Sequence, residues 1–167
     1  LSGSQCSLTD CAGNSCTVEC RADVLFHADP TDIDSAFAGQ EWLAFIEVED
    51  TAGGYDFGSA IGVDLGTLRA IDVLGAIDYG ALTANSDTGS FNASTSVLNL
   101  GNVGVNLEVT GTDLSDGGSS VIPANSQKFA TSTFSYSACG ALCGSVSSTT
   151  PIAVDIDLNK PTVDTPL

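Results

Sequence analysis

Hydrophobic and polar residues alternate along much of this chain, and this period-two pattern is typical of strands with one buried face. In residues 16–26 the apolar phase runs from Cys16 to Phe26, while Glu19 and Arg21 occupy the polar phase. We predict a strand in this run. We also predict one in each of five further runs with the same alternation, at residues 41–50, 55–65, 69–79, 103–109 and 152–158.

Clusters of turn-forming residues separate these runs, as at residues 51–54 and 115–118, and Gly, Ser and Asp in such clusters favour tight turns. The chain holds 18 Gly, 20 Ser and 16 Thr, a composition that disfavours helix. Short strands with one apolar face predict an all-β fold, namely an antiparallel β-sandwich of Ig-like or jelly-roll-like type with Greek-key connections.

The length of 167 residues suits a single domain. We assign residues 16–167 to the β-sandwich domain and residues 1–15 to a cysteine-containing N-terminal extension. The chain begins at Leu1 and contains no Met, so we expect a mature product from which a targeting segment has been removed.

Three apolar residues interrupt the alternation, because Leu25, Leu43 and Phe45 fall in the polar phase of their strands. One interpretation is a central strand covered on both faces by loops. The other is an apolar strip that another subunit covers, which makes these three residues a candidate subunit interface. The pattern alone leaves both interpretations open.

The charge restricts the partners. Acidic residues number 21 and basic residues 4, for a formal net charge of -17. Nucleic acids and anionic membrane surfaces are bound through Lys and Arg, so this charge argues against both. The apolar runs fall short of the ~18 residues of a membrane span, so we expect no membrane insertion.

The six cysteines gather at two places. Zinc sites favour tight C-x2-C pairs, often with His, whereas three or four residues separate neighbouring cysteines here and His27 lies outside the cluster. We therefore favour disulfides, formed in a secreted or extracellular protein. The four cysteines near the N-terminus allow three pairings, and the other two are expected to bridge locally across a turn. The candidate disulfide residues are Cys6, Cys11, Cys16 and Cys20, followed by Cys139 and Cys143.

The sequence carries no recognisable catalytic motif. His27 is its one histidine and is expected to face outward on a strand, so it offers no base for a nucleophilic triad. The sequence has no Gly-x-Ser-x-Gly elbow and no Gly-rich phosphate loop ahead of a helix, the motifs of two common enzyme classes. We therefore expect a protein that is not an enzyme and holds no organic cofactor.

An acidic loop offers a candidate metal site. Asp29, Asp32 and Asp34 surround Pro30, and carboxylate oxygens gathered in a loop suit Ca²⁺. Their spacing differs from the twelve-residue EF-hand loop. The alternative is a solvated acidic turn in a very acidic protein, so calcium binding at this loop is a hypothesis.

Residues Asn92-Ala93-Ser94 form an N-glycosylation sequon within a Ser- and Thr-rich stretch, and such sequons are modified on exposed segments of secreted proteins. One sequon is close to what chance produces. We keep Asn92 as a candidate glycosylation site because residues 91–96 are expected to be accessible.

Two stretches resemble the Ig-like surface domains of archaea and candidate-phylum bacteria. Residues 42–53 have the strand-and-turn pattern W-x-A-x-I-x-V-x-D-x-A-G, and residues 99–114 have the pattern N-x-G-N-V-x-V-N-L-x-V-x-G-T-D, with residues 122–129 following as in those domains. The likeness extends over residues 23–160. It rests on turn glycines and core positions, with no catalytic residue to carry over.

Such domains are similar in plan to the subunits of archaeal bundling pili and of bacterial biofilm matrix fibres, in which each β-sandwich receives a strand donated by its neighbour. The resemblance implies a further apolar strand after Lys160-Pro161, which this sequence lacks, and therefore an open sheet edge. We expect residues 1–10 to be the donated strand, although residues 151–160 have the better strand pattern.

We therefore expect a structural subunit of an extracellular, pilus-like filament, a glycosylated homopolymer built by donor-strand complementation. The alternative is a non-polymerising cell-surface or surface-layer adhesion domain, stabilised by calcium, that contacts other cells or surface glycans. A glycan-binding site uses exposed aromatic side chains, and Trp42, Tyr55 and Tyr79 fall in the predicted buried phase. This favours the filament.

Overall fold

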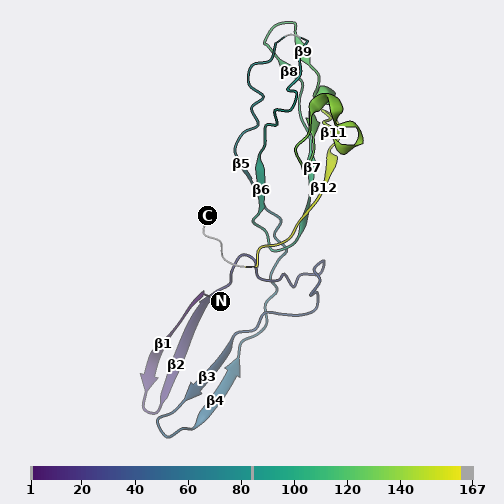
Figure 1. Cartoon of the computed structure of the whole chain (residues 1–167). Helices are drawn as coiled ribbons and strands as arrows, with labels where there is room; N and C mark the ends of the chain where they lie inside the picture. The colour runs from purple at the N-terminus through teal and green to yellow at the C-terminus, as the bar shows by residue number, and fades with distance from the viewer. Residues whose placement is uncertain (1, 84, 163–167) are drawn as a thin grey trace. The chain divides into compact units, whose positions relative to one another are not determined.

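A computed structural model describes residues 2–83 and 85–162 of the chain (Figure 1). Its strands pair antiparallel throughout this part, which confirms the predicted all-β, antiparallel class. Its helices are three-residue 3-10 turns, η1 (Ala124–Ser126), η2 (Tyr136–Ala138) and η3 (Gly140–Leu142). Within the described residues, no helix has the length and apolar character needed to cross a membrane.

Contacts along the backbone divide the chain into two compact units. Of the described residues, the first comprises 2–70, 100–103 and 160–162, and the second comprises 71–83, 85–99 and 104–159. The sequence predicted one domain over residues 16–167 after an extension at 1–15. In the structure this boundary falls where a strand begins, so the expected extension is one arm of a hairpin.

That hairpin joins β1 (Ser2–Ala12) and β2 (Ser15–Asp23) in the first unit. Two disulfides cross it, Cys6–Cys20 and Cys11–Cys16. Of the three pairings that the sequence left open, this is the nested one, in which the Cys11–Cys16 bond lies inside the loop closed by Cys6–Cys20. An isolated two-stranded hairpin is marginally stable in water, and two cross-links within one hairpin greatly reduce the freedom of the unfolded segment.

A bulge places both disulfides on the same face of this hairpin. Cys6 and Cys11 are five positions apart, so they would lie on opposite faces of a regular strand. One extra residue interrupts the register near Asp10, whose φ of 49° is left-handed, as in many β-bulges. Leu8 lies opposite Val18 on that face. We call this surface the cystine face, formed by the two disulfides with Leu8 and Val18 between them.

The second hairpin of the first unit joins β3 (Phe45–Glu49) and β4 (Tyr55–Ser59), and a bridge between Trp42 and Val63 extends it. Its turn forms because the Asp50 carboxylate accepts hydrogen bonds from the N–H groups of Ala52 and Gly54, at 2.7 and 2.9 Å. Asp is favoured in turns for such bonds to the backbone.

The second unit contains the remaining strand pairs. β5 (Ile71–Leu74) pairs with β6 (Ser96–Asn99), and β7 (Val105–Val109) pairs with β12 (Ile152–Leu158). Four two-residue strands form two further pairs, β8 (Leu114–Ser115) with β9 (Val121–Ile122) and β10 (Lys128–Phe129) with β11 (Gly144–Ser145).

The described strands therefore form six sheets of two strands each, and closure into a β-sandwich is not seen. Each of the six predicted runs contains one strand, shorter than the run in most cases. β1, β6 and the two-residue strands lie outside the six predicted runs. For β6 and the two-residue strands the reason is length, because segments of two to four residues are too short to show a period. A strand with one partner has its other backbone edge open.

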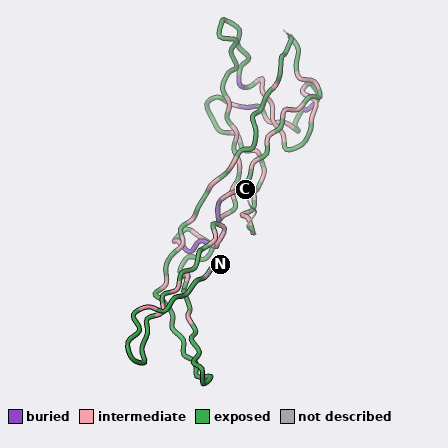
Figure 2. The backbone as a smooth tube through the Cα atoms, turned by 90° about the vertical axis from the view of Figure 1, so that its left-hand side faces the viewer, coloured by how far each residue is buried: buried purple, intermediate pink, exposed green. Residues whose placement is uncertain are grey.

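Few of the described residues are buried (Figure 2). Among the described residues, the buried apolar ones are Pro30 in the first unit and Ala124, Cys139 and Val146 in the second. In the first unit, Trp42 is half-buried and Thr31 and Asn102 are buried polar residues. The apolar phases of the strands are thus largely accessible to solvent within one chain.

Candidate assembly surface

The β3–β4 hairpin has an apolar strip on one face. Its register sets Phe45 opposite Ser59 and Glu47 opposite Phe57, and directly opposed residues of an antiparallel pair share a face. Phe45 and Phe57 are thus diagonal neighbours, and their rings stack with centroids 5.6 Å apart. The strip, called here the aromatic strip, consists of Leu43, Phe45, Tyr55 and Phe57.

These side chains are exposed, at 61% for Leu43, 62% for Phe45, 66% for Phe57 and 73% for Tyr55. The expectation that Tyr55 lies in a buried phase is wrong. Its alternation was read correctly, but the pairing of Tyr55 with Glu49 puts it on the same face as Phe45. The structure thus brings the predicted interface residues Leu43 and Phe45 together with two aromatic residues that the sequence assigned to the core.

The opposite face of this hairpin carries apolar side chains as well, together with Asp56, which lies opposite Val48. Ile46 lies opposite Gly58, and Gly58 has open space where a Cβ would stand. A pocket of about 380 Å³ follows this face, lined by Ile46, Val48 and residues 56–60. Glycine inside a strand often marks a place where another backbone or a ligand comes close. Neither face of the hairpin is therefore an ordinary solvated face.

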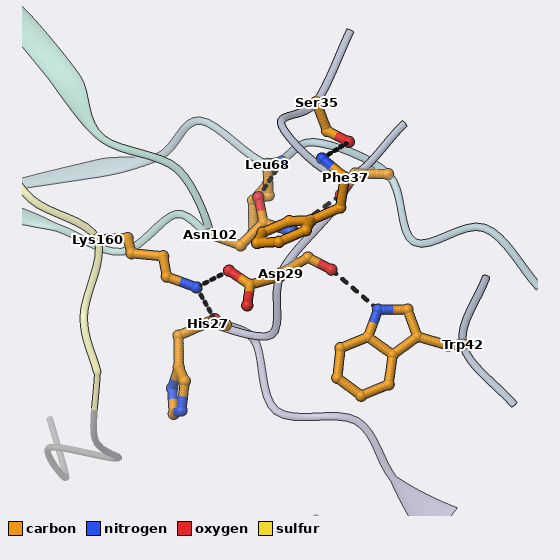
Figure 3. Close-up of polar contacts among 9 residues, drawn as sticks. His27, Asp29, Ser35, Phe37, Trp42, Leu68, Asn102 and Lys160 are labelled. Carbon is orange, nitrogen blue, oxygen red and sulfur yellow. Dashed lines mark hydrogen bonds and ion pairs between the residues drawn. The ribbon is translucent and has the colours of Figure 1, made fainter. Parts of the chain in front are cut away.

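Leu25, the third predicted interface residue, lies apart from the aromatic strip. It lines a pocket of about 350 Å³ together with Trp42, Lys160 and neighbouring residues of the first unit. The Trp42 Nε1–H donates to the backbone oxygen of Asp29 at 2.9 Å. The bond fixes the indole against the acidic loop (Figure 3).

The acidic loop is engaged by the protein itself. The Asp29 carboxylate pairs with the Lys160 ammonium, which also donates to the backbone oxygen of His27 at 3.3 Å (Figure 3). Asp34 is exposed. Among the described residues, no group of three metal-ligating side chains comes together. His27 lies beyond the end of β2 in a turn and not, as expected, on a strand.

Asp32 is held by Thr67, which donates to its carboxylate from the backbone N–H at 2.7 Å and from the hydroxyl at 2.8 Å. These hydrogen bonds, with a smaller contribution from the charge of Arg69, hold the pKa of Asp32 below its ordinary value, because both favour the charged carboxylate. Asp29 and Asp32 thus have separate structural partners.

Asn102 is a structural residue that sequence reasoning missed. It is 2% exposed. Its Oδ1 accepts from the Leu68 N–H at 2.7 Å and its Nδ2 donates to the Gly66 carbonyl at 3.0 Å. Thr31 holds the same loop from the other side, through its backbone N–H to Leu65 at 2.8 Å. The sequence signal was a Gly-Asn dipeptide, which indicates a turn but not the distant loop that the amide bonds.

Asn92 uses its side-chain amide within the second unit. Its Nδ2 donates to the carbonyls of Ser90 and Phe134, at 2.7 and 2.8 Å, and its Oδ1 accepts from the Phe134 N–H at 3.0 Å. A glycan on Nδ2 replaces one N–H of this group. Glycosylation of the folded protein would therefore cost at least one of these bonds, and Asn92 stays a candidate site on the sequon alone.

Cys139 and Cys143 are thiols in the structure, whereas the sequence predicted a local disulfide. The two cysteines flank the 3-10 turn η3, and their thiols are close enough to form a hydrogen bond with each other. Burial raises the pKa of the Cys143 thiol to about 11, and the neighbouring Cys139 thiol adds to the rise. A neutral, partly buried thiol is a poor nucleophile.

The chain exposes much more surface than a folded monomer of its size. Its solvent-accessible area is 12274 Å², whereas a globular monomer of 16.9 kDa exposes about 7,700 Å². Even two separate globular units of half this mass would expose about 9,300 Å² together. The chain therefore exposes at least about 3,000 Å² more surface than a compact fold of this mass.

No known protein family, characterised protein or solved structure matches this chain.

Proposed function

We propose that this protein is a structural subunit that assembles with copies of itself into an extracellular filament through its open strand edges and exposed apolar faces. The observation that carries the proposal is the surplus of about 3,000 Å² of exposed surface beyond that of two compact units. A standard protein interface buries about 800 Å² on each partner. A subunit inside a filament contacts at least two neighbours, which requires about 1,600 Å².

The exposed apolar side chains favour assembly, because their burial against another subunit is more favourable than their exposure to water. Full burial of a large apolar side chain is worth about 1.5–3 kcal/mol, so the four residues of the aromatic strip, already about one-third covered, supply roughly 4–8 kcal/mol. Association itself costs an estimated 4–15 kcal/mol. The strip alone is therefore insufficient, and hydrogen bonds between strand edges and the opposite apolar face of β3–β4 must contribute as well.

The charge determines how assembly depends on salt. The four basic side chains are engaged within their own chain or lie near its carboxylates: Arg21 pairs with Glu19, Lys160 pairs with Asp29, Lys128 donates to the Tyr136 carbonyl, and Arg69 acts on Asp32. Subunits of charge -17 repel each other over a distance that falls from about 10 Å in 0.1 M salt to about 3 Å in 1 M salt. Salt should therefore promote assembly.

The alternative is a monomeric surface domain stabilised by calcium. Asp29 and Asp32 already have protein partners, which weakens the case for a calcium loop. The exposure of Tyr55 removes one argument against glycan contact, so the surplus surface, and not the aromatic residues, favours the filament. The two disulfides fit an extracellular location for either function. We propose no catalytic role.

Electron microscopy of the purified chain at 0.1 M and at 1 M NaCl tests the proposal, with size-exclusion chromatography of the same samples. We expect regular fibres that become more abundant at 1 M NaCl. A monodisperse monomer near 16.9 kDa at both salt concentrations would contradict the filament proposal. Calcium and glycan titrations would then test the alternative.

A further inference from the structure

We infer that the disulfide-locked β1–β2 hairpin is the donated element of this assembly, and that it pairs as a complete two-stranded unit with the β3–β4 hairpin of a second copy of the chain. The inference rests on the proposed function and names the contact. It replaces the expectation that residues 1–10 act as a single donated strand.

The disulfides decide against the donation of one strand. Cys6 in β1 is bonded to Cys20 in β2, and Cys11 is bonded to Cys16. For β1 to leave β2 and complete a neighbouring sheet, both bonds would have to break. An intact hairpin can be donated with its cross-links closed, and its order is already established before it binds.

The hairpin has the open edges that such a contact needs. β1 and β2, of 11 and 9 residues, are the longest strands in the described part of the chain, and within that part each pairs with the other alone. Natural proteins protect long edge strands with Lys, Pro or a bulge. These two strands contain neither Lys nor Pro, and the bulge near Asp10 leaves a regular register over Gln5–Thr9. Leu8 on the cystine face is 67% exposed.

The β3–β4 hairpin is the best acceptor for physical reasons. It carries apolar side chains on both faces, and a stable sheet in water needs three or more strands with an apolar face. Edge-to-edge pairing of the two hairpins produces a four-stranded sheet in which the cystine face continues the apolar surface of β3–β4. In this contact the β1–β2 hairpin of one subunit meets the β3–β4 hairpin of the next. Because the two surfaces differ, each subunit keeps one free surface for a further copy, and the contact can repeat along a filament.

The contact also suits the size of the exposed surface. One such pairing gives each subunit two interfaces, one through its β1–β2 hairpin and one through its β3–β4 hairpin. Two standard interfaces bury about 1,600 Å² per chain, which lies well within the surplus of about 3,000 Å².

The state of the disulfides in the polymer gives the first test. Fibres of a chain carrying Cys139→Ser and Cys143→Ser, in which the four hairpin cysteines alone can form disulfides, are treated with iodoacetamide, boiled in SDS without reductant and separated on a gel. We expect monomers with both disulfides intact. A ladder of covalent multimers that collapses with reductant would mean that β1 of one copy is bonded to β2 of the next, and this would overturn the inference in favour of single-strand exchange.

A pair of neighbouring substitutions gives the second test. Leu8→Lys places a charge on the cystine face, whereas Ser7→Lys adds the same charge one position away, on the opposite face of β1. Leu8→Lys should raise the concentration needed for fibre formation about tenfold or more, with Ser7→Lys close to the unmodified chain. On the acceptor, Phe57→Lys should have the same effect and Thr51→Lys, in the β3–β4 turn, should not.

The outcomes separate the two proposals. If the unmodified chain forms no fibres, the filament function fails and this inference fails with it. If fibres form, but Leu8→Lys and Ser7→Lys have equal effects, or neither has any, the subunit function stands and the hairpin contact is overturned.

Discussion

The Oδ1 atom of Asn102 lies 2.7 Å from the backbone nitrogen of Leu68 and accepts its hydrogen bond across 34 positions of sequence. The backbone nitrogen of Asn102 donates to the Leu68 carbonyl at 3.0 Å, so the two residues are joined in both directions. Because the first unit has little apolar core, such buried polar contacts contribute much of the stability of its loops.

Replacement of Asn102 by Ala should destabilise the first unit by about 2–3 kcal/mol, because the Leu68 N–H and the Gly66 carbonyl lose their partner in a buried place. Urea unfolding followed by Trp42 fluorescence measures the change, since Trp42 belongs to the same unit. Gln40→Ala is the control, because it removes an exposed amide side chain in the same unit, and it should change the free energy of unfolding by less than about 0.5 kcal/mol. Equal effects of the two variants would contradict the role of the amide.

Substitutions at Asn92 and Ser94 distinguish a structural role of the Asn92 amide from a role of a glycan attached to it. Asn92→Ala removes both the sequon and the hydrogen bonds to Ser90 and Phe134, whereas Ser94→Ala removes the sequon and keeps the amide. We expect Asn92→Ala alone to lower the stability of the second unit, by about 1–2 kcal/mol, as measured by thermal unfolding of protein from the native host. If Ser94→Ala has the same effect, a glycan and not the amide is responsible.

Asp32 should contribute a pH-dependent part of stability. Hydrogen bonds from Thr67 hold its pKa below the ordinary value of 3.8, so its contribution is fully present above pH 3.8 and is lost as the pH falls through the lower value of the folded state. The difference in stability between the unmodified chain and Asp32→Asn should therefore be largest near neutral pH and shrink in acid. Unfolding midpoints from pH 7 to pH 2 measure it.

The matched control for Asp32 is Asp34→Asn, which removes the same charge from an exposed side chain two positions away. Both variants reduce the net charge equally, so general repulsion cancels in the comparison. A pH dependence that is the same for both variants would show that the bonds from Thr67 have no effect on stability.

Cys139 and Cys143 should behave as two hidden thiols. Without reductant, the native chain should react slowly with a thiol reagent at pH 8, because Cys139 is buried and the pKa of Cys143 is raised to about 11. The unfolded chain should release two thiols. Because the thiol of Cys143 stays neutral in the folded state while an unfolded thiol ionises near pH 9.0, stability should fall as the pH rises from 9 toward 11.

A count of zero thiols in the unfolded, unreduced chain would mean that a third disulfide joins Cys139 and Cys143, as the sequence alone suggested. Cys143→Ser provides the control, since it should leave one thiol and abolish the alkaline loss of stability.

The strand positions could be read from the sequence because alternation is a local property. β12 (Ile152–Leu158) matches the predicted apolar run closely, and β2 lies within one residue of the start of its run. β1 escaped this reading because the bulge at Asp10 breaks its period, so that Cys6 and Cys11 seem to belong to opposite faces.

The candidate surface could be predicted in part. Leu43 and Phe45 stood out because they violate the phase of their own strand, which a sequence reveals. Tyr55 and Phe57 did not stand out, because they obey the phase of theirs. They join the same strip through the register that pairs Glu49 with Tyr55 and Glu47 with Phe57, and a shift of one residue would have sent them to the other face.

By itself, the sequence determined the all-β class, six of the described strands, the strong negative charge and the absence of familiar catalytic motifs, because these follow from composition and from patterns within a few neighbouring residues. The tertiary structure decided which cysteines pair, which apolar faces stay exposed, and that Asn102 holds Leu68 and Asp32 holds Thr67. Those depend on which distant segments meet and in what register, and the energy of such contacts is not contained in any one segment.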